Sequence, residues 1–339
     1  MKNLGRKAKV LESCHLGKLK EAHANNDKIS AVRIGKAYLA GTAKEVWVPD
    51  AKTQERRDWF HAHRKAVKQV TRARNSLLSY LSDQGVRLQQ GIRLTTAEAQ
   101  TKLRAVAPWS TRQWQVIELL VVQLRHAEEH RVRWRGLIAQ EVLSDPELVS
   151  MVRLCGVREM VAFALAAFVG DINRFAHPKK LVKYVGLNPA FDESGQAQWS
   201  GGVGGHGNKH LRSLLVQAAQ SILRCSRTPL ATWGKKLLAR KGQKNLVIAA
   251  MARKLTVAVW YLMKGRWSAL EELDQPLQVK VTKILSQTGL KPSQARQQLR
   301  QQAYAWLKDK NISILGGKVY VHQPDGTVSL GPKLQPAVA

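Results

Sequence analysis

The chain of 339 residues is 44% hydrophobic, which is enough for two or three domains with their own cores and excludes a largely disordered protein. Its 55 Lys and Arg residues against 24 Asp and Glu residues give a formal net charge of +31. The charge is spread along the whole chain, which favours nucleic acid as the partner over a membrane surface. No uninterrupted apolar run reaches the length that spans a bilayer.

The first residues and the cysteines indicate the compartment. Charges are scattered through Met1–Lys20, which argues against a secretory signal. Cys14, Cys155 and Cys225 lie far apart and form no CxxC motif. This usage fits a reducing cytoplasm and argues against a disulfide framework or a structural zinc site.

The N-terminal region mixes strand-like and helical patterns. Val10–Cys14 is typical of a short strand, and Val46–Pro49 of a short extended segment. A helix is predicted between them, from the spacing of Val32, Ile34, Ala37 and Leu39. Asp27 precedes this helix, and its spacing favours a role as N-cap; the alternative is a metal-binding carboxylate at the helix entrance.

A long helical pattern follows from Asp50, interrupted at Gly85 and Gly91. Its heptad-like seam consists of Phe60, His63, Val67, Val70, Arg74, Leu77 and Leu81. The seam of a second helix consists of Ile117, Leu120, Leu124, Ala127, Arg131, Trp134 and Ile138. These seams predict an antiparallel hairpin, or arms that pair with another subunit. His61 and His63 are read as surface or heptad residues, not as metal ligands.

The outward faces of these helices are predicted to be basic, with Arg56, Arg57, Lys65, Lys68, Arg72, Arg125, Arg131, Arg133 and Arg135. A charged helix face is usually just solvated. Because nearly all the charge here has one sign, the pattern favours contact with a polyanion.

A helical hairpin is predicted next. Asp145 is expected to cap a helix that begins at Pro146, and two helical patterns meet at Gly156-Val157. Its turn has two interpretations, an ordinary core hairpin or a site where backbone N–H groups meet a DNA phosphate. A further helix, Lys179–Val185, is predicted to end at Gly186.

The stretch Leu181–Ala219 carries the strongest candidate site. A glycine-rich loop over residues 201–207 precedes a helix whose first turn carries Lys209, His210 and Arg212. Glycines allow the backbone to approach a ligand, and a helix N-terminus adds a positive dipole. We therefore expect a phosphate site, with the nucleic-acid-binding residues Gly204, Gly205, Gly207, Lys209, His210 and Arg212.

Ser194 lies just upstream as a candidate hydroxyl nucleophile, but no His–Asp pair is spaced to activate it. The residues alone therefore make Ser194-Gly195 a turn. A P-loop nucleotide triphosphatase is disfavoured, because Asn208 and Lys209 stand where Lys and Ser or Thr are expected.

The remaining chain is mostly helical in pattern. The core stripe of the helix after the glycine loop consists of Leu211, Leu214, Leu215, Ala218 and Ile222. Lys235–Lys244 is cationic, and Asn245–Lys264 is expected to be a buried helix that contains Arg253 and Lys254. A polar helical region is predicted to reach Trp306, followed by a small β-hairpin near residues 319–328.

Two runs carry a resemblance to a known family. GLNPAFDESG at Gly186–Gly195 and GGxGGHGNKxLRxLLxxAA at Gly201–Ala219 resemble insertion-sequence transposases of the IS-one-ten type, also labelled IS-one-sixteen or IS-nine-oh-two. Cys155–Phe175 resembles the hairpin that opens the same domain of that family. The resemblance covers most of Lys18–Arg266.

The N-terminal part is similar to another portion of that family. Asn26–Ala31, Val46–Pro49 and the Arg-rich helix to Leu81 resemble the end of its RuvC-like part and its coiled-coil arm. The implied fold is mainly α. It comprises a remnant of an RNase H-like α/β domain (residues 1–50), a coiled-coil helical arm (51–145), an all-helical transposase domain with a helical hairpin (146–272), and a helical and β-prone tail (273–339).

The resemblance implies DNA cleavage and strand exchange in the bacterial cytoplasm, in association with the nucleoid. It implies a serine nucleophile, Ser194, and an acidic Mg²⁺ site that includes Asp27. The implied partners are DNA at the element ends and target, a guide RNA as in some family members, and further copies of the chain as a dimer or tetramer.

The sequence departs from the family at Ser30, where a second acidic residue is usual, and the strands with the first two acidic residues are expected before Met1. We therefore expect an N-terminally truncated member. The alternative to a transposase is a catalytically impaired nucleic-acid-binding remnant of one.

Overall fold

The computed structural model describes residues 9–12, 26–88, 93–194, 197–203, 206–226, 228–265, 277–291, 294–306, 312–315, 318–322 and 328–330. The chain divides into two compact units, Met1–Gln54 and Glu55–Ala339. The described part is mainly α-helical, as predicted.

The first unit contains helix α2 (Asp27–Leu39), which has no buried residue. Its N-cap is Asn26, whose side chain accepts a hydrogen bond from the backbone N–H of Ile29 at 2.8 Å, so the capping role predicted for Asp27 was wrong by one position. Leu11 forms an isolated antiparallel bridge with Glu45, while residues 13 and 14 of the expected strand lie outside the described residues. An RNase H-like remnant stays a prediction.

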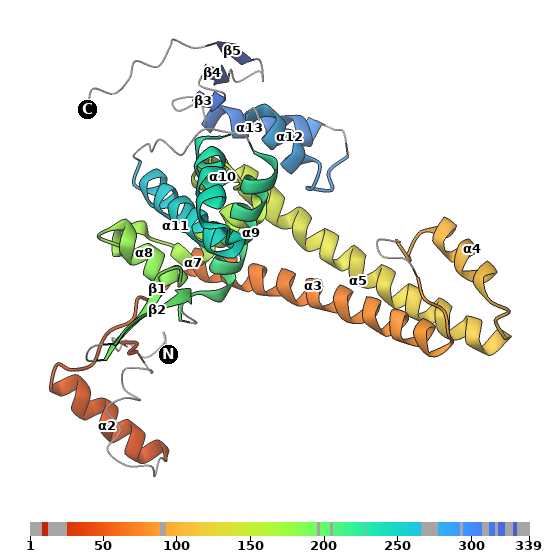
Figure 1. Cartoon of the computed structure of the whole chain (residues 1–339), viewed down its shortest axis with the longest axis horizontal. Helices are drawn as coiled ribbons and strands as arrows, with labels where there is room; N and C mark the ends of the chain where they lie inside the picture. Colours follow the sequence, from red (N-terminus) through yellow and green to blue (C-terminus); the bar gives the residue numbers. More distant parts are fainter. Residues whose placement is uncertain are drawn as a thin grey trace. The chain divides into compact units, whose positions relative to one another are not determined.

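The arm, defined here as α3 (Ala51–Asp83), α4 (Ala97–Val106) and α5 (Thr111–Ser144), confirms the two long helices (Figure 1). α3 and α5 pack together through a hydrophobic cluster to which α4 contributes Leu103. The other helical members of this cluster are Ala73, Leu77, Leu81, Ile117, Val121 and Leu124.

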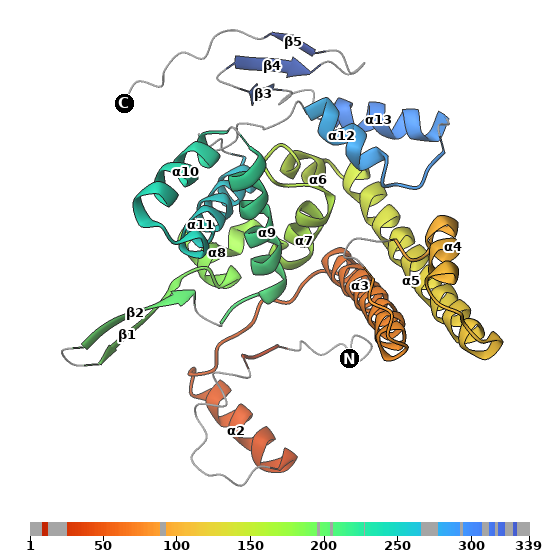
Figure 2. The same ribbon diagram turned by 45° about the vertical axis from the view of Figure 1, so that its right-hand side comes forward.

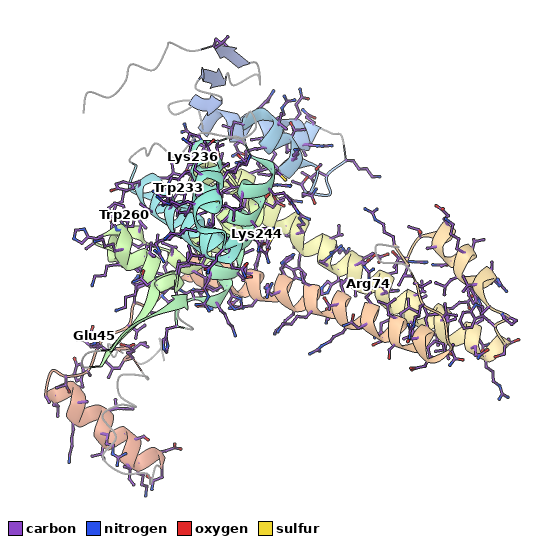
Figure 3. All side chains as sticks on the ribbon, in the orientation of Figure 1. Glu45, Arg74, Trp233, Lys236, Lys244 and Trp260 are labelled. Carbon is purple, nitrogen blue, oxygen red and sulfur yellow. The ribbon has the colours of Figure 1, made fainter. Side chains whose placement is uncertain are left out.

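The seam of α3 is rotated slightly from the predicted one. Ala66 and Ala73 are buried, whereas Val67 is half-buried and Arg74 is exposed. The exposed Arg74 lies on the outer part of the arm (Figure 3). A straight helix turns every 3.6 residues and therefore drifts from a heptad repeat, which brings the small alanines into the contact.

The helical core, defined here as α6 to α11, follows the arm (Figure 2). α6 (Pro146–Met151) is capped by Asp145 as predicted, and α7 (Glu159–Val169) is almost entirely buried. The turn between them is also buried: Leu154 and Val157 are 0% exposed. Of the two interpretations, the core hairpin is therefore the one that the burial favours.

The next helices complete the core: α8 (Pro178–Val185), α9 (Lys209–Cys225), α10 (Pro229–Lys241) and α11 (Lys244–Met263). α8, α9 and α10 all pack against α11. By length and composition, α11 could cross a membrane, although no apolar run of that length was expected from the sequence. Half of its most apolar window is buried inside the protein, as expected of a core helix.

Two helices near the C-terminus, α12 (Leu277–Leu285) and α13 (Gln294–Trp306), pack on α5 and on each other. The buried ammonium group of Lys280 donates to the carbonyl oxygens of Val152 and Leu154 at 2.7 and 2.6 Å. These bonds satisfy carbonyl groups that follow α6 and attach α12 to the core.

Strands form two small antiparallel sheets. β1 (Pro189–Ser194) pairs with β2 (Ala197–Val203) in a ribbon that leaves the core between α8 and α9 (Figure 2). β3 (Ile312–Leu315), β4 (Lys318–His322) and β5 (Val328–Leu330) form the second sheet. The prediction of an all-helical domain was therefore wrong at residues 189–203, and Gly201 and Gly202 belong to a strand, not a loop.

Candidate nucleic-acid interface

The base of the β1–β2 ribbon is closed by two glycines. Gly186 ends α8 with a φ of +80°, and Gly207 has a φ of +101°. A Cβ added at Gly186 would lie 2.0 Å from the carbonyl oxygen of His206, so the chain entering the ribbon touches the chain leaving it. The backbone N–H of Asn208 closes the junction by donating to the carbonyl of Tyr184 at 2.8 Å.

Two arginines hold the same junction from the core. Arg212 Nη1 donates to the carbonyl oxygens of His206 at 2.9 Å and Gly186 at 3.3 Å. Arg253 donates twice to the carbonyl of Leu187, at 3.1 and 3.0 Å. Arg212 was predicted to bind nucleic acid and Arg253 to lie in a buried helix; both position the ribbon in this structure.

The first turn of α9 has a capping residue that the sequence reading missed. The side-chain oxygen of Asn208 accepts hydrogen bonds from the backbone N–H groups of His210 and Leu211, at 3.0 and 3.1 Å. An Asn directly before a helix is the signal that could have identified it. Lys209 is exposed beside this cap, whereas Gly204 and Gly205 lie outside the described residues.

His210 lies in a cluster of rings from three helices. Its imidazole stacks on Phe168 of α7, with ring centroids 5.6 Å apart and an interplanar angle of 18°. The rings of His61 and Phe60 on α3 lie edge-on to it, at 5.4 and 5.6 Å. Burial and then the charges of neighbouring cations lower the pKa of His210 below its ordinary value. Sequence spacing could not reveal this cluster, because its members are far apart in the chain.

Several arginines predicted to face outward are instead tied to the protein. Arg56 bonds Glu141 at 2.9 Å and Asp145 at 2.5 Å. Arg57 donates to the carbonyl of Ala167 at 2.8 Å, and Arg135 bonds Glu159 at 2.6 Å. The prediction of a uniformly outward basic face was wrong at these positions, because carboxylate and carbonyl partners arrive from distant helices. Lys65, Lys68, Arg72, Arg125 and Arg133 are exposed.

Another basic surface surrounds the junction of α10 and α11. The sequence from 194 to 270 contains 13 Lys and Arg residues and no Asp or Glu. We define the α10–α11 corner as the exposed side chains of Lys236, Arg240, Lys241 and Lys244, with Lys236 on α10 and Lys244 at the start of α11 (Figure 3). Next to it, Lys254 lies over the ring of Trp233, 4.7 Å from its centroid. The corner is therefore a positively charged surface on a stretch of chain that carries no carboxylate.

The two residues predicted to be catalytic belong to different units. Asp27 is the exposed first residue of α2 in the first unit. Ser194 is the last residue of β1 in the second unit and pairs with Ala197 at the end of the ribbon. Within the described residues no group of three or more His, Cys, Asp or Glu side chains could hold a metal ion. These residues therefore do not fit a complete Mg²⁺ site.

Comparisons with known proteins bear on this arrangement. Residues 151–233, from α6 into α10, match a family model described as Transposase IS116/IS110/IS902 family. A transposase for insertion sequence element IS1111A from Coxiella burnetii is 24% identical over 242 residues, covering 70% of this chain and 66% of the relative.

Two other relatives are similarly distant. A probable family 20 transposase from Pseudomonas aeruginosa is 24% identical over 243 residues, covering 70% of this chain and 72% of the relative. A transposase for insertion sequence element IS1328 from Yersinia enterocolitica is 26% identical over 244 residues, covering 69% and 70%. The chain thus spans about two thirds of the length of these curated relatives.

Proposed function

We infer that this chain, which belongs to the IS116/IS110/IS902 family of transposases through residues 151–233, binds the DNA of an insertion sequence and catalyses cleavage and exchange of its strands. The matched part of the family model includes α7, α8, α9 and the β1–β2 ribbon. We propose residues 146–272 as the transposase domain and residues 51–145 as its arm.

The observation that carries DNA binding is the run without acidic residues. Thirteen cations in residues 194–270 have no carboxylate neighbour in sequence, and the α10–α11 corner exposes four of them. A surface of this kind attracts a phosphate backbone, because binding releases counterions from the DNA. The bacterial cytoplasm, where the nucleoid lies, is the compartment we propose.

Ser194 is the nucleophile that we propose. Its oxygen attacks the phosphorus of a DNA phosphodiester and forms a Ser–O–P bond, while the bond from phosphorus to one deoxyribose oxygen breaks. The serine proton passes to solvent, and the departing deoxyribose oxygen takes up a proton. The phosphoserine link keeps the energy of the broken bond, so a second DNA strand can later displace the serine.

Asp27 is proposed as one carboxylate of an acidic Mg²⁺ site in the RuvC-like remnant, which residues 1–50 would form. One carboxylate does not hold a catalytic Mg²⁺ ion by itself. We therefore route no step through the metal.

Self-association through the arm, as a dimer or tetramer, is part of the proposal. The outer face of α5 exposes Val116, Leu119 and Val122 at helical spacing, and Leu119 is 71% exposed. Burying these side chains against a second arm would remove apolar surface from water. Light scattering with Leu119→Glu tests this step, and an unchanged mass would contradict it.

A guide RNA from the element is proposed as a further partner of the basic surfaces.

The alternative function is a nucleic-acid-binding protein without cleavage activity. The observation in its favour is that no metal-binding cluster exists within the described residues. Both functions require DNA binding, but only the first requires a covalent intermediate.

The test is trapping of a protein–DNA adduct. Labelled element-end DNA is incubated with the chain and Mg²⁺, and denaturing gels detect the adduct. Wild type and the control Ser213→Ala, an exposed α9 position, should form the adduct, whereas Ser194→Ala should not. Binding without any adduct supports the alternative, and absence of DNA binding contradicts both functions.

A further inference from the structure

A second cationic surface lies where α3 meets the start of α9. On α3, His61 and Lys68 are exposed and Arg64 is half-buried. On α9, Lys209 is exposed and His210 is half-buried. We call these five residues the α3–α9 face. The stacked ring of Phe168 forms its apolar floor, because it contacts both imidazoles, His61 at 5.8 Å and His210 at 5.6 Å between centroids.

The charges that act on His210 all have the same sign. His61, Arg64 and Lys68 act from α3 and Lys209 from α9 itself. From the α7 side the neighbour is Phe168, with Arg57 of α3 6.0 Å from its ring centroid. The nearest acidic residue along α3 is Asp58, one turn before His61, and it is not among the charges that shift the pKa of His210.

Gathering like charges on a folded surface is unfavourable unless an anion joins them. Arg64 also lacks an acceptor: its Nε atom is buried and has no hydrogen-bond partner among the described residues. Elsewhere in the second unit, Arg56 and Arg135 have carboxylates at 2.9 and 2.6 Å. The α3–α9 face therefore has the charge of a binding site whose anion comes from a partner.

We propose that the α3–α9 face binds the phosphate backbone of a nucleic acid, and that His210 takes up a proton when it binds. This inference rests on the proposed function for its choice of polyanion and adds a site on α3 and a dependence on pH. A nucleic acid fits better than a single phosphate, because the cations come from two helices and a flat ring surface lies between them.

The direction of the pH dependence follows from the free protein. Burial and the surrounding cations keep the pKa of His210 below its ordinary value, so the imidazole is largely neutral near pH 8. A phosphate beside it stabilises the imidazolium and raises the pKa. The bound state therefore holds more protons than the free state, and the affinity rises as the pH falls.

The size of the effect has an upper limit. Uptake of one proton changes an affinity by at most about tenfold per pH unit. Between pH 8 and pH 6 we expect the wild-type affinity for a duplex to rise on the order of tenfold, with ionic strength held constant.

The experiment compares two histidine sites by fluorescence anisotropy of a labelled duplex of about 30 base pairs at pH 6, 7 and 8. The test variant His61→Phe/His210→Phe keeps rings against Phe168 but cannot take up protons. The control His126→Gln removes an exposed histidine of α5. We expect the control to keep the wild-type rise and the double variant to lose it.

The double variant must first show the wild-type unfolding temperature. If it does not, the single variant His210→Gln, which also cannot take up a proton, is measured instead and should lose the rise. A second readout uses Arg64→Ala/Lys68→Ala, which should weaken binding at every pH. Inorganic phosphate at equal ionic strength should compete only weakly; full competition would indicate a small-anion site and overturn the proposal.

Two failures are distinguishable. If the duplex does not bind at any pH, the proposed function fails. If binding is salt-dependent but its pH profile is unaffected by the double histidine variant, only the present inference is overturned.

Discussion

The base of the arm and the α10–α11 corner are both rich in cations, but only at the base do carboxylates bond to these cations. At the base, Arg56 is 7% exposed and is shared by Glu141 and Asp145, and Arg135 bonds the buried carboxylate of Glu159. At the corner, Lys236, Arg240 and Lys244 project from a stretch of sequence without Asp or Glu.

The difference shows that the number of cations does not by itself identify a nucleic-acid surface. A cation with a carboxylate within hydrogen-bonding distance is already neutralised and contributes to the fold. The positive potential of a cation without such a carboxylate extends into the solvent and attracts a polyanion. The two regions should therefore respond oppositely to mutation.

The largest expected effect is at the base. Arg56→Ala leaves the carboxylates of Glu141 and Asp145 without their shared partner, one of them buried. Breaking a buried ion pair from one side costs about 3–5 kcal/mol. Chemical denaturation should show this loss, with DNA affinity per folded molecule unchanged. Lys65→Ala, an exposed position on the same helix, is the control and should be nearly neutral. An Arg56→Ala protein as stable as wild type would contradict the structural role.

A second prediction concerns the protonation of the buried residue His63 at the base of the arm. His63 is 8% exposed, and burial followed by the charges of Arg135, Arg131 and Arg64 lowers its pKa from 6.5 to about 4. Between these values the unfolded chain binds a proton that the folded chain excludes, so stability falls as the pH falls. The His63 contribution from pH 8 to pH 5 is about 2 kcal/mol.

The measurement compares unfolding free energies of wild type and His63→Leu at both pH values. Leu cannot take up a proton, so the variant should lose about 2 kcal/mol less than wild type on acidification. Equal losses in the two proteins would show that His63 is already charged or solvated at the base.

The smallest effect expected on stability is at the corner. Lys236→Ala/Arg240→Ala/Lys244→Ala should change the free energy of unfolding by less than about 0.5 kcal/mol per site. DNA affinity should fall by about tenfold, and the slope of log affinity against log salt should decrease by about 2–3. The control is Lys102→Ala, whose ammonium already bonds Glu98 at 2.7 Å. Unchanged DNA affinity in the triple variant would contradict the proposal that the corner, unlike the base, binds DNA.

Sequence periodicity predicted the long elements well. The helices α3, α5, α9 and α11 were expected close to their observed positions, because each carries a long apolar stripe. Residues 151–233 match the model of the family predicted from residues 155–175, 186–195 and 201–219. These are local signals, and they need no knowledge of what lies opposite in the fold.

Contacts between distant residues were the part that sequence could not supply. Arg56 meets its carboxylates 85 and 89 residues later in the chain, and Arg212 reaches back 26 residues to Gly186. A pattern shows only that such side chains are basic, not which group neutralises them. The β1–β2 ribbon was missed because glycines in a strand have the same local signature as a loop.

The bonds from Lys280 to the chain after α6 have a consequence for synthesis on the ribosome. α12 and α13 lie against α5 and α6, which are translated more than 100 residues earlier, since α6 ends at Met151 and α12 begins at Leu277. That flank of α5 and α6 therefore stays uncovered on the nascent chain until residues 277–306 have been synthesised. We therefore expect the packing around α5 and α6 to be completed only after α13 has emerged from the ribosome.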